Sequence, residues 1–247
     1  MLKRVVNFNP GPAAVPLDVL KIVQGELLDY KSTGMSILES SHRAKEFEEI
    51  NDQTMGLVRE VLGLGPDYRV LFLGGGASTQ FDLIPLNFVG AGQVAAYVDT
   101  GDFAARALKE CQIVARAHVA FSSKEEKYRR VPKMGEIKYP EDAAYLHVCS
   151  NNTIEGTQFQ EFPNTGSVPL VADMSSEMVS RRLDFKKFSL IYAGAQKNLG
   201  VAGVTLVVIR DDLLARANKG LPTLFSYKTH ADNKSLYNTP RCSAFIS

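Results

Sequence analysis

The sequence contains Leu190-Ile191-Tyr192-Ala193-Gly194-Ala195-Gln196-Lys197-Asn198, an apolar strand that runs into small residues and ends on a lysine. A second apolar strand, at residues 203–209, follows almost at once. Small residues let another group approach the backbone closely. A lysine at the end of a buried strand is partly desolvated, which disfavours its charged form and favours an amine that attacks carbonyls. Lys197 is therefore a candidate nucleophile, although most of the 28 lysines and arginines belong to solvated surface.

Length and composition describe one large domain with balanced charge. The 247 residues can bury a sizeable core, and 28 basic against 27 acidic residues favour neither nucleic acid nor a membrane as partner. No apolar run reaches the length of a membrane span, and the first residues lack a signal-peptide core. Cys111, Cys149 and Cys242 are widely spaced, and the four histidines show no metal-ligand spacing. We therefore expect a cytoplasmic protein without disulfides or a bound metal.

Apolar strands alternate with helices along the chain, which predicts an α/β fold: a mostly parallel sheet with helices on both faces. Residues 1–16 are expected to form an N-terminal arm, and residues 17–247 one domain. The pattern predicts strands at 70–73, 94–98, 113–115, 144–148, 168–173, 190–194 and 203–209, and helices from Pro16, over 45–62, from about Gln80 and from about Asp102. The charged segment 122–142 is expected to be irregular surface. In such sheets, ligands bind at the carboxyl ends of the strands.

A glycine turn, Gly74-Gly75-Gly76-Ala77-Ser78-Thr79, joins the first strand to a helix. Backbone N–H groups and the helix dipole at such a turn bind anions, and two hydroxyls lie beside them. The turn is not a Walker loop, because Gly-Lys-Ser/Thr is absent. It half-resembles a dinucleotide fingerprint, since Gly74 and Gly76 fit while Thr79 replaces the third glycine. Asp99, at the end of the next strand, would then be the ribose acid, and this alternative stays open.

Other polar and aromatic residues lie where strands end or helices begin. Thr153, Asp173 and Lys197 follow predicted strands, and Asp173 either caps a helix or faces a ligand. Phe103, at a helix start, either fills the core or stacks on a planar ring. A phosphate cradle, a carboxylate, a ring contact and a Schiff-base lysine together suit pyridoxal phosphate, because the carboxylate keeps the ring nitrogen protonated.

Residues before the helix at 45–62 have two interpretations. Ser40 and Ser41 are expected to cap that helix. Arg43 lies at the same helix start, where its planar guanidinium can bind the carboxylate of a substrate.

Specific motifs cover nearly the whole chain, at residues 7–12, 41–43, 74–81, 85–87, 97–101, 152–156, 173–176, 192–198 and 237–240. The most specific is Tyr192-Ala193-Gly194-Ala195-Gln196-Lys197-Asn198. Together they resemble the phosphoserine aminotransferase family, which belongs to the class V aminotransferases of fold type I. The resemblance implies pyridoxal phosphate as cofactor and amino transfer between glutamate and 3-phosphohydroxypyruvate. The products would be phosphoserine and 2-oxoglutarate, within serine biosynthesis.

The resemblance also implies a role for each matching residue. Lys197 would form the Schiff base, Asp173 would pair with the ring nitrogen, and Phe103 would stack on the ring where many relatives have Trp. Arg43, with His42, would bind the substrate. The remaining cofactor contacts would come from Ala77, Ser78, Thr153 and Gln196, and from Asn238 and Thr239, which would reach the partner subunit's cofactor phosphate in a homodimer.

The chain also departs from the family pattern near its end. Arg241 follows Pro240 where relatives usually have a second proline. Relatives continue into a smaller C-terminal domain that binds the substrate phosphate, and we expect that domain to be absent here. Two alternatives remain open: another class V pyridoxal phosphate enzyme, or a non-catalytic fragment that binds cofactor or dimerises. The lack of a cysteine in an evident mobile loop argues against a desulfurase.

Overall fold

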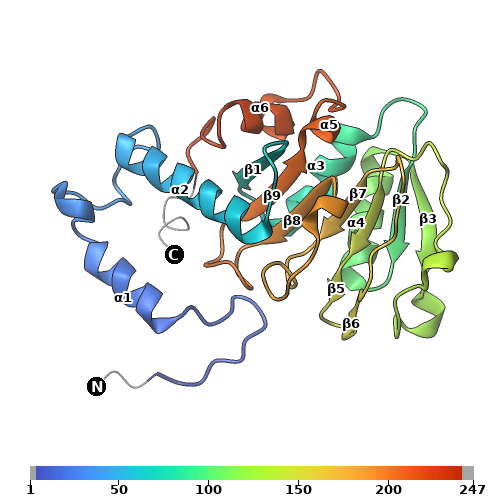
Figure 1. Cartoon of the computed structure of the whole chain (residues 1–247), viewed down its shortest axis with the longest axis horizontal. Helices are drawn as coiled ribbons and strands as arrows, with labels where there is room; N and C mark the ends of the chain where they lie inside the picture. Colours follow the sequence, from blue (N-terminus) through green and yellow to red (C-terminus); the bar gives the residue numbers. More distant parts are fainter. Residues whose placement is uncertain (1–3, 241–247) are drawn as a thin grey trace.

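A seven-stranded sheet runs through the molecule in the order β1-β9-β8-β7-β4-β2-β3 (Figure 1). The computed structural model describes residues 4–240. Among these residues, β9 alone runs antiparallel to its neighbours, and the other six strands share one direction. The strands are β1 (Tyr68–Leu73), β2 (Ala95–Asp99), β3 (Ala117–Ser122), β4 (Leu146–Cys149), β7 (Leu170–Asp173), β8 (Leu190–Gly194) and β9 (Thr205–Arg210). A separate two-stranded ribbon pairs β5 (Asn151–Asn152) with β6 (Thr157–Gln158).

Helices lie on both faces of the sheet, as the alternating pattern predicts. The second half of α2 packs on one face, and α3, α4, α5 and α6 pack on the other. The α-helices are α1 (Leu17–Glu26), α2 (Lys45–Leu62), α3 (Gly76–Phe88), α4 (Asp102–Val114), α5 (Asp211–Leu214) and α6 (Tyr227–Asp232). Short 3₁₀ turns occupy Tyr30–Ser32, Lys124–Glu126, Met134–Glu136, Phe185–Lys187 and Thr223–Phe225.

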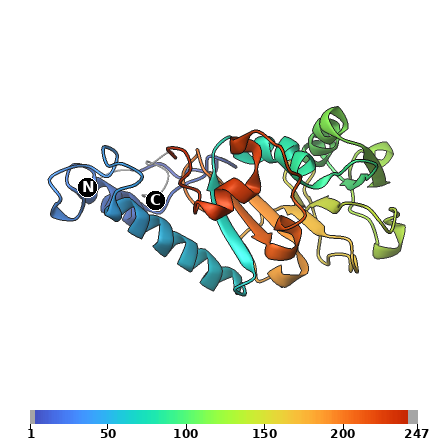
Figure 2. The ribbon, with the colours of Figure 1, turned by 90° about the horizontal axis from the view of Figure 1, so that it is seen from above.

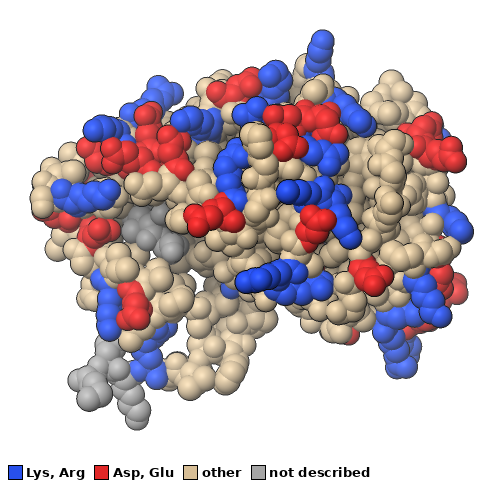
Figure 3. All heavy atoms as spheres, viewed as in Figure 1, with Lys and Arg blue, Asp and Glu red and all other residues tan. Residues whose placement is uncertain are grey.

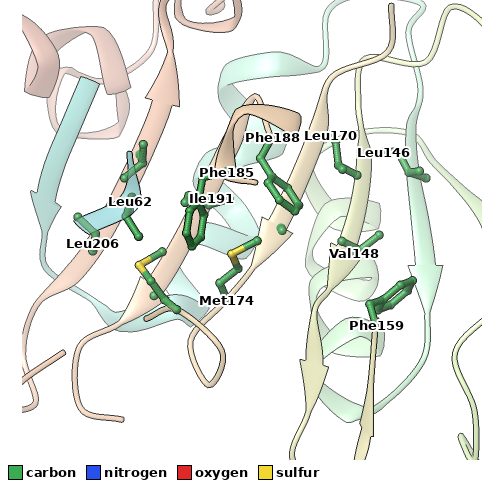
Figure 4. Close-up of a cluster of buried hydrophobic side chains, with 14 of the residues drawn as sticks. Leu62, Leu146, Val148, Phe159, Leu170, Met174, Phe185, Phe188, Ile191 and Leu206 are labelled. Atoms are coloured by element: carbon green, nitrogen blue, oxygen red, sulfur yellow. The ribbon is translucent and has the colours of Figure 1, made fainter. Parts of the chain in front are cut away.

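Each face of the sheet carries its own apolar core. On the α2 face, side chains from β4, β7, β8 and β9 meet the end of α2 and residues of the connecting segments (Figure 4), namely Leu62, Leu146, Val148, Phe159, Leu170, Met174, Phe185, Phe188, Ile191 and Leu206. On the other face, Phe81, Ile84 and Phe88 of α3 pack against Tyr192 and Val207. Every residue of β7 and β8 is buried, because helices and connecting segments cover both faces of the sheet there. Every residue of β2 and β4 is buried as well, so the strands that carry the candidate site lie among the enclosed central strands of the sheet.

Most predicted elements are present within a few residues, and α2 has the predicted bounds. The strand predicted at 113–115 is wrong, because Ile113 and Val114 form the last turn of α4 and β3 begins at Ala117. The predicted serine caps of α2 are also wrong: Ala44 is the N-cap residue, and the Ser41 hydroxyl instead accepts the Arg43 N–H at 3.2 Å.

The arm before α1, together with α1 itself, stands apart from the sheet (Figures 1 and 2). No residue of α1 is buried, and Val5, Phe8 and Leu28 are each at least 85% exposed. The arm still touches the main body, because the Ala13 N–H donates to the carbonyl oxygen of Gln196 at 2.8 Å. The predicted arm therefore passes directly beside Lys197.

Charged side chains of both signs are interspersed over the face drawn in Figure 3, in line with the net charge of +1. Within residues 4–240, no helix combines the length and the hydropathy that crossing a membrane requires.

Candidate active site

The carboxyl ends of β1, β8, β7 and β4 meet along one edge of the sheet, where the antiparallel β9 begins. Leu73 at the end of β1 pairs with Thr205, which pairs with Gly194 at the end of β8. Asp173 at the end of β7 pairs with Tyr192 of β8 and with Cys149 of β4. The glycine turn, Asp173 and the segment carrying Lys197 therefore leave the sheet at the same edge, where open α/β sheets bind ligands.

Asp173 is a buried carboxylate at this edge, and only 6% of the residue is exposed. Its Oδ1 accepts the Ser175 N–H at 2.9 Å. Burial raises the pKa of Asp173, while the hydrogen bond from Ser175 and the charge of Lys197 lower it. Turns rather than a helix follow Asp173, so the structure contradicts the helix-cap interpretation.

Lys197 lies in a short loop whose two ends are fixed by β8 and β9. The Ala195 N–H donates to the Val204 carbonyl at 2.9 Å, which closes the loop. The Asn198 amide donates to the carbonyls of Ser176 and Met178, both at 3.1 Å. These bonds fix the backbone on both sides of Lys197, whose side chain is half-buried.

Phe103, near the start of α4, faces that lysine. The Lys197 Nζ lies 5.4 Å from the centre of the Phe103 ring, within the range of a cation–π contact. Phe103 is only half-buried, so part of its ring is available to a ligand. Lys197, Asp173 and Phe103 are thus brought together as the sequence predicts.

Glu155 anchors the start of α4, and sequence reasoning assigned this residue no role. Its Oε1 accepts the Asp102 N–H at 2.7 Å, in a helix whose N-cap residue, Gly101, has no side chain. A carboxylate at this position is also stabilised by the positive end of the helix dipole. The loop that carries Thr153 is thereby tied to the helix that carries Phe103.

The glycine turn after β1 starts α3 with its backbone N–H groups open. Gly75 and Gly76 have φ angles of 91° and 73°, which favour glycine, and α3 has no side-chain cap. The Thr79 hydroxyl donates back to the Gly75 carbonyl at 2.8 Å, whereas Ser78 is exposed. The first turn of α3 thus has the features of an anion site.

The dinucleotide alternative loses support at Asp99. This carboxylate is 5% exposed, and its Oδ2 accepts the hydroxyls of Ser122 at 2.7 Å and Tyr128 at 3.3 Å. Both partners belong to β3 and the segment after it, so Asp99 holds the sheet edge together. A ribose acid would instead present its carboxylate to the ligand.

Several predicted residues make no hydrogen bond or ion pair with Lys197 in the described part of the chain. Thr153 is exposed at the tip of the β5–β6 turn, and Arg43 is exposed before α2 beside the half-buried His42. Asn238 and Thr239 line a cavity of about 300 Å³ that Gly74 and Thr79 also line. Arg241 and Cys242 lie outside the described residues.

The remaining predicted cofactor residues flank this group. Gln196 is half-buried beside Lys197, and its side-chain amide folds back over Gly194. Ala77 is half-buried and packs against the α3 face core. Both therefore lie at the same sheet edge as Asp173.

The sequence and the fold place this chain in a known protein family. The model of the aminotransferase class-V family matches residues 5–247, and the chain belongs to that family. A phosphoserine aminotransferase of Niallia circulans is 53% identical over 97% of this chain and 66% of its own length. The chain thus spans about two thirds of the length of this curated relative.

Solved structures give the same result. Phosphoserine aminotransferase from Bacillus circulans subsp. alkalophilus superimposes with a TM-score of 0.94 at 52% identity, over 97% of this chain and 66% of that one. The pyridoxal-phosphate-bound phosphoserine aminotransferase from Trichomonas vaginalis has a TM-score of 0.90 at 36% identity, over 98% of this chain and 68% of that one. The predicted α/β fold of the class V aminotransferases is confirmed.

Proposed function

We propose that this chain is the cofactor-binding part of an enzyme that transfers an amino group between glutamate and 3-phosphohydroxypyruvate, giving phosphoserine and 2-oxoglutarate. The observation that carries the proposal is the strand-end cluster of Lys197, Asp173 and Phe103 in a chain 53% identical to a phosphoserine aminotransferase. Such a reaction would belong to serine biosynthesis.

The residues at the sheet edge fit pyridoxal phosphate. The open N–H groups of α3, with Ala77, Ser78 and Gln196, suit a phosphate dianion. Lys197 offers the primary amine for an aldehyde, and the buried carboxylate of Asp173 suits a protonated ring nitrogen. Phe103 supplies an aromatic face, and Thr153 a hydroxyl nearby. The donor set thus matches each chemical group of this cofactor.

When bound, pyridoxal phosphate supplies an aldehyde and an electron-withdrawing ring. The chain's own residues would then do three things. Asp173 holds a proton on the ring nitrogen, because a buried carboxylate stabilises a cation beside it. Lys197 would hold the cofactor through its primary amine, and the same amine would hold or move a proton at that position. Arg43, with His42, would orient the substrate carboxylate through its guanidinium.

Two parts of the proposal concern groups beyond the cluster. Asn238 and Thr239 would contact the partner subunit's cofactor phosphate in a homodimer. The exposed side chains of Val5, Phe8 and Leu28 support such an interface, because they are large and apolar. Residues 1–16 would be an arm on a domain of residues 17–247. The relatives' remaining third would complete the substrate site, and without it the chain would bind cofactor but transaminate slowly.

Cofactor addition followed by borohydride reduction tests the proposal. We expect pyridoxal phosphate to give a visible absorbance band, and reduction to leave a pyridoxyl group on Lys197 in the peptide map. Lys187, which ends a 3₁₀ turn before β8, is a matched control, and Lys187→Ala should label like the parent. A label that stays after Lys197→Ala would refute the site assignment.

Turnover then separates an enzyme from a fragment that only binds cofactor. The assay measures phosphoserine formation by this chain and by a version extended with the last third of a relative. Binding without turnover in both forms would favour a non-catalytic role.

A further inference from the structure

A turn follows β7 and bonds to both sides of the candidate site. It comprises residues 174–179, between Asp173 and the strand that leads to Lys197. At its start, the Ser175 N–H donates to Asp173 Oδ1 at 2.9 Å, and the Ser175 hydroxyl oxygen accepts the Gly194 N–H at 3.0 Å. Ser175 therefore fixes the carboxylate of Asp173 relative to the end of β8.

Asn198 bonds the far part of the same turn to the loop that carries the lysine. This asparagine directly follows Lys197, and its side-chain amide donates to the carbonyl oxygens of Ser176 and Met178, both at 3.1 Å. Two carbonyl acceptors use both protons of the Nδ2 group, which sets the orientation of the amide. The residue next to the candidate nucleophile is thus bonded to the turn that also bonds the candidate carboxylate.

The turn holds a backbone conformation that its own sequence does not favour. Val179 has a φ angle of 57°, a left-handed conformation that is an outlier for a β-branched residue. Its side chain is 41% exposed, so burial of that side chain does not drive the conformation. Such strain persists where surrounding contacts determine the backbone. The contacts next to Val179 are the Asn198 bond to the Met178 carbonyl and the fully buried Glu177, which accepts the Arg181 guanidinium at 2.6 Å.

A second set of bonds anchors the turn on its other side. Asn151 Nδ2 donates to the Ser176 hydroxyl at 2.9 Å, and that hydroxyl donates to the Asn151 carbonyl at 3.0 Å. These bonds hold the turn on the β5–β6 ribbon, so the turn is a fixed support. Asn198 joins the loop of Lys197 to that support.

We propose that Asn198 is a positioning residue: it holds the loop of Lys197 against the turn after β7 and so fixes the spacing between the Lys197 amine and the Asp173 carboxylate. This inference rests on the proposed function, because pyridoxal phosphate carries its aldehyde and its ring nitrogen at opposite positions of one rigid ring. A ring of fixed size bonds both residues only when their spacing matches it, to within about 0.5 Å. Freeing the loop should therefore weaken cofactor binding, even though the changed residue is not one of those assigned to the cofactor.

The test replaces Asn198 by aspartate, which has the same shape but lacks both donors. Because Asn198 is exposed, the core should stay intact. Asn218→Asp is a closely matched control, since the Asn218 amide also donates to two carbonyls, those of Leu86 at 2.8 Å and Val89 at 2.9 Å. These two carbonyls lie at the far end of α3 from the glycine turn. Both variants should lower the melting temperature, so two other measurements decide.

The first measurement is amide hydrogen exchange in the cofactor-free 247-residue chain. The N–H groups of Leu199 and Gly200 donate to the Ala195 carbonyl at 3.1 Å and 2.9 Å, so their exchange reports how well the loop of Lys197 is held. Exchange at both amides should accelerate in Asn198→Asp and keep the parent rate in Asn218→Asp.

The second measurement is an absorbance titration with pyridoxal phosphate. The dissociation constant should rise about three- to tenfold in Asn198→Asp, the range expected for one hydrogen bond, and should not change in Asn218→Asp. Asn198→Ala removes the same donors without adding a charge beside Lys197, and it should weaken binding in the same way.

Unchanged amide exchange in both Asn198 variants would overturn the positioning role. So would a dissociation constant for both within about twofold of the Asn218→Asp value, which is the scale of a neutral surface change. If the parent bound no pyridoxal phosphate, the proposed function would fail, while the exchange rates would still decide whether Asn198 holds the loop.

Discussion

Gly101→Ala should destabilise the chain by displacing Glu155, which anchors the start of α4. Gly101 has an extended φ of 171°, so alanine fits its backbone. An added Cβ would lie 2.6 Å from Glu155 Oε2 and 2.8 Å from Asn152 Oδ1, closer than atoms can approach. Asn152 is held by the hydroxyls of Thr100 and Thr157, so Glu155 has to move.

Moving Glu155 breaks its bond to the Asp102 N–H. A hydrogen bond to a charged group contributes about 1.5–3 kcal/mol, and a charge at a helix N-terminus about 0.3–1 kcal/mol. We therefore expect Gly101→Ala to lower the free energy of unfolding by about 2–4 kcal/mol. Because Glu155→Ala removes the same bond, the double variant should lose less than the sum of the single losses.

Urea denaturation followed by circular dichroism measures these differences. Gly56→Ala is the control: an added Cβ there meets no atom within 4 Å, and Gly56 lies inside α2. That change should stabilise the chain by about 0.5–1 kcal/mol. If Gly101→Ala unfolded within about 0.5 kcal/mol of the parent, a surface-sized effect, the anchoring role of Glu155 would be refuted.

Two further predictions concern the ligand site. Burial raises the pKa of Asp173 in the folded state, so the stability that the protonated carboxyl contributes is lost as the pH rises through that pKa. Asp173→Asn should therefore have a higher melting temperature than the parent near pH 7. The same variant should transaminate far more slowly. The difference in melting temperature should vanish below about pH 4, and a constant difference would contradict the assignment. Gly11→Ala should weaken pyridoxal phosphate binding several-fold in absorbance titrations, because φ is 152° and the added Cβ would lie 3.0 Å from Lys197 Cγ. Gly25→Ala, with open space around it, should bind like the parent.

The sequence predicted the parts of the site that leave a local signal. The run from Leu190 to Lys197 is apolar and then small, so both the strand and the half-buried lysine after it were predictable. Ile113 and Val114 misled because β-branched residues favour strands, yet here they are 69% and 39% exposed at the end of α4.

Contacts between distant segments could not be predicted in this way. Glu155 meets Asp102 across a separation of 53 residues, and nothing near either residue signals the bond. The hydrogen bond between His147 and Tyr192 likewise depends on the register of three strands. The reversed direction of β9 did leave a signal, because the loop after β8 is too short for a helical crossover.

The position of β9 between β1 and β8 sets the order in which the sheet can assemble during synthesis. The first strand, Tyr68–Leu73, pairs only with Thr205–Arg210 in the described chain, so it emerges from the ribosome long before its partner exists. Until then, the apolar residues of β1 have unpaired backbone groups, which favour association with other chains. Nascent chains that end before residue 205 should therefore depend on chaperones most strongly, and this dependence should fall once β9 has been made.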